Sequence, residues 1–109
     1  MALFNTTTHD EFTKKVLESK NLVLVDFWAQ WCPPCRMMAP ILESVAEKLD
    51  GVDVVKVDIE QSADNNKLAS TYGVQGIPNM QVFKDGIVVK ELVGMRPQSV
   101  LEQELAALR

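Results

Sequence analysis

The chain has few of the residues that build metal sites or nucleic-acid surfaces. Only two of its 109 residues are cysteine and only one is histidine, so a four-ligand Cys/His zinc site cannot form within one chain. Its 11 lysines and arginines are scattered and outnumbered by 15 acidic residues, which leaves no basic stripe for nucleic acid. No apolar run approaches the ~20 residues of a membrane-spanning helix. We therefore expect no resident metal, no nucleic-acid partner and no membrane partner.

The N-terminal stretch MALFNTTTHDEF also lacks the basic and apolar regions of a secretory signal, so we expect a cytoplasmic, soluble protein. What is present is an ordinary domain composition, 47% hydrophobic and 24% charged. A chain of this size buries roughly two-thirds of its unfolded surface, which is enough to fold without a metal or disulfide framework. No repeat or linker composition interrupts it, and we expect one domain over residues 1–109.

Turn signals separate segments whose periodicity alternates between strand and helix. Residues 22–29 are apolar on both faces, as in a central strand covered by helices, and Asp85-Gly86 between two apolar runs predicts a hairpin. Further strands are expected at 3–4, 52–59, 80–83 and 87–93, with helices at 9–19, from the dithiol to Asp50-Gly51, at 65–72 and from Pro97 onward. The fold class is α/β, with a mixed five-stranded sheet and about four helices on both faces.

Two details of the expected helices depend on single residues. Pro40 should bend the helix that follows the dithiol without ending it. In the last helix, one face should carry the apolar side chains of Val100, Leu101, Leu105 and Leu108.

The two cysteines lie between the end of a buried strand and the start of a helix, where open α/β sheets place reactive groups. Unpaired N–H groups and the helix dipole should stabilise a thiolate at Cys32, while Cys35 should be more buried. The sulfurs can close a disulfide, so Cys35 can resolve a mixed disulfide formed at Cys32. The alternatives are an inert disulfide or half of a zinc site shared between chains. So short a loop constrains little of the unfolded chain, and no second ligand pair exists.

Seven motifs occur around and beyond the dithiol. They are Val25 to Cys32, Cys35 to Pro40, Lys56 to Asp58, Tyr72 to Val74, Gly76 to Pro78, Phe83 to Gly86, and Val93-Gly94. Together they resemble the thioredoxin family, in the family's order and over essentially the whole chain. The resemblance implies the thioredoxin fold and a general thiol–disulfide oxidoreductase that reduces protein disulfides.

The resemblance also implies roles for individual residues. Cys32 attacks and Cys35 resolves, while Asp26 is a buried carboxylate with a raised pKa that acts through water as base for Cys35. Lys56 is its charge partner. The remaining alternatives are a partly solvated aspartate and an exposed lysine.

A docking surface for protein disulfides is implied around Cys32. Pro78 is a cis-proline facing the disulfide, which leaves the backbone of Ile77 free to pair with an extended client chain. The full set of implied contact residues is Trp31, Pro33, Pro34, Ile59, Val74, Ile77, Pro78, Val93, Gly94 and Met95. Each apolar residue of this set could instead belong to the ordinary core.

Partners follow from the resemblance as well. The protein should bind no cofactor itself and should receive electrons from NADPH through a flavoprotein thioredoxin reductase. Its clients should be disulfide-containing proteins such as peroxiredoxins and reductases with cysteine intermediates. We expect a monomer.

Two positions depart from the family pattern. Pro33 replaces glycine, and Asn79 replaces the threonine that follows Pro78. Pro33 removes an N–H near the helix start, and Pro34 should push Pro33 toward extended geometry. Three alternatives remain. One is a dedicated electron donor to a peroxidase, because Trp-Cys-Pro-Pro-Cys also resembles tryparedoxins and nucleoredoxins. The others are a disulfide oxidant or isomerase tuned by Pro33, and a binding module whose cysteines are incidental.

Overall fold

Residues 2–109 are described by a computed structural model of the chain. Five strands form one sheet: β1 (Leu3–Asn5), β2 (Leu22–Trp28), β3 (Val52–Asp58), β4 (Asn79–Lys84) and β5 (Ile87–Val93). Their order is β1-β3-β2-β4-β5, with β3 parallel to β1 and β2, and β4 antiparallel to β2 and β5. The predicted mixed five-stranded sheet is confirmed.

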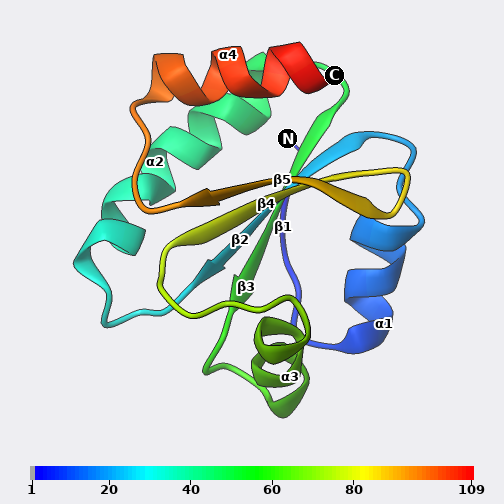
Figure 1. Cartoon of the computed structure of the whole chain (residues 1–109), viewed down its shortest axis with the longest axis vertical. Helices are drawn as coiled ribbons and strands as arrows, with labels where there is room; N and C mark the ends of the chain where they lie inside the picture. Colours follow the sequence, from blue (N-terminus) through cyan, green and yellow to red (C-terminus); the bar gives the residue numbers. More distant parts are fainter. Residues whose placement is uncertain (1) are drawn as a thin grey trace.

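Helices cover both faces of this sheet. They are α1 (His9–Phe12), the π-helix η1 (Thr13–Leu17), α2 (Pro33–Lys48), α3 (Ala63–Thr71) and α4 (Gln98–Leu108). In Figure 1, α2 and α4 lie above the sheet, whereas α1 and α3 lie below it. The central strand β2 is therefore buried from Leu22 to Phe27. Within residues 2–109, no helix combines the length and apolar character needed to cross a membrane.

Alternation along the strands divides the core in two. The α2/α4 cluster is aliphatic and contains Leu22, Leu24, Met38, Leu42, Val45, Ala46, Val52, Val54, Met80, Val82, Leu92, Leu101 and Leu105. The α1/α3 cluster includes three phenylalanines and contains Phe12, Val16, Val23, Val25, Phe27, Val55, Val57, Leu68, Ala69 and Phe83. The sheet separates these clusters, so each face can be altered without touching the other.

The turn between β4 and β5 matches the predicted hairpin. Asp85 and Gly86 both have positive φ, at 53° and 79°. A Cβ at Gly86 would lie 2.9 Å from the carbonyl oxygen of Leu17, so this position needs glycine for space as well as for conformation.

Two helices differ from their predicted extents by two residues at one end, and α4 begins at Gln98, one residue after the predicted Pro97. The helix expected over 9–19 ends at Leu17 and is a π-helix from Thr13, where the Glu18 N–H donates to the Thr13 carbonyl at 2.9 Å, five residues back. Hydrophobic spacing does not separate this geometry from an α-helix, because both keep residues four apart on one side. The helix expected from residue 65 begins two residues earlier because Ser62 caps it. Pro40 lies inside α2 and does not end it.

The face predicted for the last helix is wrong in one residue. Leu101 and Leu105 are buried and Leu108 is half-buried, but Val100 is 40% exposed. One residue along an α-helix rotates the side chain by ~100°. Val100 therefore points away from the face that Leu101 presents to the core.

Candidate active site

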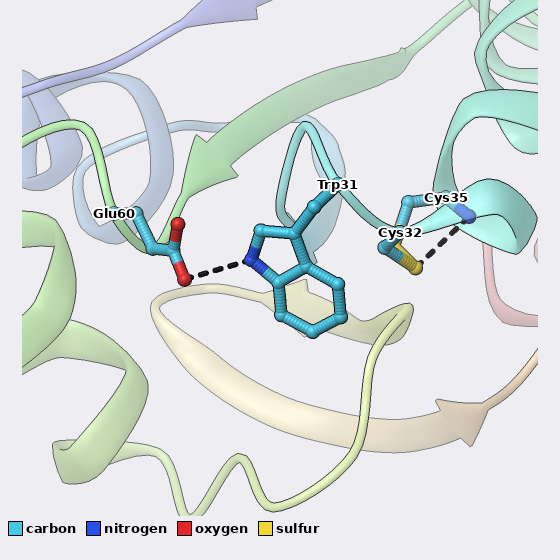
Figure 2. Close-up of a disulfide and its surroundings, with 4 residues drawn as sticks. All are labelled: Trp31, Cys32, Cys35 and Glu60. Carbon is cyan, nitrogen blue, oxygen red and sulfur yellow. Dashed lines mark hydrogen bonds between the residues drawn. A yellow bond between two sulfur atoms is a disulfide. The ribbon is translucent and has the colours of Figure 1, made fainter.

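The candidate site lies where β2 ends and α2 begins, at the left of Figure 1, beside the connection between α3 and β4. Cys32 is the extended N-cap residue of α2, with φ −91° and ψ 107°. Its Sγ is joined to that of Cys35 in a disulfide, with the two Cα atoms 5.3 Å apart. Figure 2 shows this pair and the Cys35 N–H that donates to the Cys32 Sγ at 3.2 Å. The predicted helix-terminal setting of Cys32 is confirmed.

The two prolines limit how many N–H groups reach the sulfur. Pro33 and Pro34 are the first two residues of α2, and neither carries an N–H. The Arg36 N–H donates to the Cys32 carbonyl at 3.1 Å, so within the first turn of α2 the Cys35 N–H is the donor to the Cys32 Sγ. The expectation that Pro33 becomes extended is wrong. Its fixed φ suits the first helical position, and the extended residue is Cys32 before it.

Both cysteines are almost fully covered. Cys32 is 3% exposed and Cys35 is 1% exposed, so the difference has the predicted direction but is small. The surface next to Cys32 is open and apolar, because Trp31, directly before it, is 63% exposed. An attacking group from another protein would therefore reach the disulfide across this apolar surface.

Asp26 lies in the middle of β2, with Lys56 of β3 and Met80 of β4 as its register partners. It is 0% exposed, and neither carboxyl oxygen has a hydrogen-bond partner among the described residues. Burial raises the pKa of Asp26 to about 7, and the positive charge of Lys56 opposes part of this rise. The alternative of a partly solvated aspartate does not fit this environment. Asp26 shares its sheet face with Leu24, which is the face that α2 covers.

Lys56 does not form a direct ion pair with Asp26. Its Nζ lies 4.3 Å from the centre of the Trp28 ring, and none of the salt bridges within residues 2–109 joins it to Asp26. Lys56 is half-buried, so the alternative of a fully exposed lysine does not hold either. The positive charge acts on Asp26 from a distance.

The implied contact residues lie at four connections, between β2 and α2, β3 and α3, α3 and β4, and β5 and α4. The Ile77–Pro78 peptide bond is cis, as the resemblance implied, and the Pro78 carbonyl accepts from the Gly94 N–H at 2.9 Å. Pro78 is buried; Pro34, Ile59, Val74, Ile77 and Gly94 are half-buried; Trp31, Pro33, Val93 and Met95 are exposed. The set thus mixes packing residues with open ones.

Glu60 is a site residue that sequence reasoning missed. Its Oε2 accepts from the Trp31 Nε1–H at 2.8 Å, and Figure 2 shows Trp31 between Glu60 and the disulfide. The Glu60 N–H in turn donates to Asp58 at 3.0 Å. Glu60 directly follows Ile59, which was an implied contact residue, so this adjacency could have found it.

Metal chemistry has no support from the side-chain arrangement. In the part of the chain that the structure describes, no three His, Cys, Asp or Glu side chains gather in a way that could hold a metal ion. The single histidine, His9, has its Nδ1 3.3 Å from Asp64.

Comparison with known proteins agrees with the geometry. The model of the thioredoxin family matches residues 4–107. Thioredoxin 1 of Synechococcus elongatus is 43% identical over 106 residues, which cover 96% of each chain. Thioredoxin of Mycolicibacterium smegmatis is 47% identical over 100 residues, 91% of this chain and 88% of the relative. The structure of a mutant thioredoxin from Halobacterium salinarum superposes with a TM-score of 0.87 at 35% identity, covering 96% of this chain and 88% of that one.

Proposed function

Because this chain belongs to the thioredoxin family and is a thiol–disulfide oxidoreductase, we propose that Cys32 is its attacking thiol and Cys35 its resolving thiol. The observation that carries this assignment is the N-cap position of Cys32, whose Sγ accepts the Cys35 N–H. A helix N-terminus stabilises negative charge, and the thiolate is the nucleophile in disulfide exchange.

The reaction balances in two exchanges. The Cys32 thiolate attacks one sulfur of a client disulfide, forming a mixed disulfide and releasing the other client sulfur as a thiolate that takes up a proton. Cys35 then loses its proton and attacks the Cys32 Sγ, which releases the second client sulfur. The client gains two electrons and two protons, and the chain ends as the Cys32–Cys35 disulfide. No bound cofactor takes part in either exchange.

Asp26 is the proton acceptor that we assign to Cys35, through an intervening water. Support comes from its burial on the sheet face covered by α2 and from a pKa raised to about 7, which lets it exchange protons near neutral pH. Lys56 sets how readily that proton leaves, by favouring the carboxylate form.

The client docks, in this proposal, on the apolar surface beside the dithiol. Trp31, Val93 and Met95 supply exposed apolar area, and Pro33 and Pro34 flank the cysteines. Ile77, preceding cis-Pro78, would pair its backbone with an extended client chain, and Ile59, Val74 and Gly94 complete the surface.

Thioredoxins interact with a thioredoxin reductase and with disulfide clients. For this chain we propose electrons from NADPH through a flavoprotein reductase, and clients such as peroxiredoxins and reductases with cysteine intermediates. We further propose a monomer, folded as a single domain, that works in the cytoplasm. A dedicated peroxidase donor, an oxidant or isomerase and a binding module with incidental cysteines are not favoured by the comparisons.

Trapping separates the roles of the two cysteines. Cys35→Ser should accumulate mixed disulfides with oxidised insulin, because the second exchange is blocked, and the matched variant Cys32→Ser should not. Both can be followed on non-reducing gels. The reverse pattern would exchange the two roles, and trapping by neither variant would remove the proposed mechanism.

The reduction potential tests the direction of the reaction. The chain can be equilibrated in dithiothreitol redox buffers while the fluorescence of Trp28 and Trp31 reports the disulfide. A potential below the glutathione poise supports a reductant. A potential well above it would show that the dithiol is the favoured state and would favour the oxidant alternative.

A further inference from the structure

The connection from Tyr72 to Pro78, between α3 and β4, is held at both ends by one buried side chain. Gln81 of β4 is 2% exposed. Its Nε2 donates to the Tyr72 carbonyl, at the start of the connection, at 3.0 Å. The same nitrogen donates to the Oδ1 of Asn79, directly after the connection ends, at 3.1 Å. A glutamine amide has two N–H donors, and both are used to join these ends.

The hydrogen-bonded chain continues to the edge of the sheet. Asn79 is 2% exposed, and its Nδ2 donates to the Glu91 Oε2 on β5 at 2.9 Å. Asn79 also faces Val93 in the strand register, and the Gly94 N–H donates to Pro78. Through β4, Glu91, Asn79 and Gln81 thus connect the two segments that carry proposed client contacts, the Tyr72–Pro78 connection and the end of β5.

An amide at this position is not needed for packing. Gln81 points to the same side of β4 as Phe83, which fills the α1/α3 cluster with an apolar ring. A buried amide contributes nothing favourable unless it is hydrogen-bonded, and an apolar side chain would pack there without that requirement. What the amide adds is a fixed separation between Tyr72 and Asn79.

We propose that Gln81 is a positioning residue for client binding, which acts by holding the Tyr72–Pro78 connection in the shape that presents Val74 and Ile77 to the client. The inference rests on the proposed function of that surface. Gln81 touches neither the dithiol nor the client, so it should affect how tightly the client docks and not how fast the sulfurs exchange. Glu91 supports the same geometry through Asn79.

A single-turnover experiment separates docking from exchange. Reduced chain is mixed with increasing oxidised insulin, and Trp28 and Trp31 fluorescence follows disulfide formation. In Gln81→Met, which keeps the side-chain length without the amide, the half-saturating client concentration should rise about fivefold or more, the loss expected for about one hydrogen bond. The limiting rate should change less than twofold, and the reduction potential should stay the same.

Three further variants serve as controls. Glu91→Met removes the exposed end of the network and should raise the half-saturating concentration by a smaller factor, whereas Glu91→Gln keeps an acceptor for Asn79 and should leave it within twofold of the wild type. Leu105→Ala removes a side chain from the α2/α4 cluster and so lowers the stability of the fold, but it should leave the half-saturating client concentration unchanged.

The outcomes are decisive in each case. If folded Gln81→Met keeps the wild-type half-saturating concentration, the amide is purely structural and the inference is overturned. A changed limiting rate or a changed reduction potential would also overturn it, because Gln81 would then act on the sulfur exchange. If Gln81→Met does not fold, the comparison of Glu91→Met with Glu91→Gln tests the inference instead. Equal half-saturating concentrations in these two variants would overturn the inference. Failure of the proposed function looks different, because the wild-type chain itself would not oxidise when the client is added.

Discussion

The two faces of the sheet differ in whether they bury an ionisable side chain: Asp26 lies on the α2/α4 side, whereas the α1/α3 cluster is apolar. On the α1/α3 side, the Phe83 ring packs edge-on against Phe12 and Tyr72, with ring centres 5.9 and 5.3 Å away. The buried amide of Gln81 on that side makes full use of its donors. On the α2/α4 side, Asp26 is 0% exposed and neither of its oxygens is paired with a described residue, and the Trp28 Nε1 is also unpaired.

This difference assigns the stability of the fold mainly to the α1/α3 side and the proposed chemistry to the α2/α4 side. Packed rings and paired amides stabilise a fold, whereas a buried carboxyl without partners destabilises it whenever it is charged. In the proposed mechanism the reaction uses this carboxyl, because a pKa of about 7 makes its proton exchangeable near neutral pH. The side that carries the disulfide therefore gives up stability, and the other side supplies it.

The largest effect should come from the α1/α3 side. Phe83→Ala removes a ring that is 1% exposed and should lower the free energy of unfolding by about 3–5 kcal/mol. Urea denaturation of the oxidised and reduced forms measures this loss. Because the cluster is separated from the dithiol by the sheet, both forms should lose the same amount and the reduction potential should not move. A potential that shifts with the stability would show that the two faces are coupled.

The opposite change is expected at Asp26. Its folded pKa of about 7 lies above the ~3.9 of an unfolded aspartate, so the folded state holds the proton more tightly and stability falls as pH rises from about 4 to 7. Asp26→Asn removes the charge but keeps unpaired polar atoms. It should raise the unfolding free energy by roughly 2–4 kcal/mol at pH 8 and by little at pH 4.

The same variant should slow disulfide reduction at neutral pH, because Cys35 loses its proton acceptor. Denaturation at the two pH values and insulin turnover at pH 7 check both parts. A gain in stability at pH 8 together with an unchanged rate would leave Asp26 as a destabilising residue outside the mechanism.

These contrasts also show what sequence can and cannot predict. The strand pattern of residues 22–29 and the Asp85-Gly86 turn depend on local chemistry, and both were predicted correctly. The parts of the site that depend on residues close together in the sequence were also predicted, such as the position of Cys32 at the start of a helix. Contacts between distant residues were not: the Trp31–Glu60 hydrogen bond joins side chains that only folding brings together.

The wrong placement of Val100 has the same origin. Val100 was placed in the core because its residue type and approximate spacing fit, but one step of helical rotation decides its exposure. Lys56 was assigned to Asp26 as its charge partner from the resemblance, and this agrees with the strand register and with the effect of the Lys56 charge on the Asp26 pKa. Its flexible side chain nevertheless places the ammonium over Trp28, which no pattern of residue types specifies.

A smaller effect is expected at the start of α2. Pro34→Ala restores an N–H at the second helical position, where an N-cap side chain can accept it. A second donor stabilises the Cys32 thiolate more than the disulfide sulfur, so the reduced form gains and the reduction potential should rise by roughly 30 mV, or about 1.4 kcal/mol. Pro97→Ala, before α4, is the matched control and should leave the potential unchanged. A lowered potential in Pro34→Ala would mean that proline geometry outweighs the added donor.

The smallest effect should come from Lys56, the positive charge nearest to the unpaired carboxyl in the strand register. Its charge favours the carboxylate form, so Lys56→Met should raise the Asp26 pKa above about 7, by less than one pH unit because no direct ion pair is lost. Carbon-13 NMR titration of the Asp26 carboxyl measures the shift, and Lys48→Met, at the far end of α2, controls for lost charge. If the Asp26 pKa stays at its wild-type value, the Lys56 ammonium interacts with Trp28 only, and its charge has no effect on the Asp26 pKa.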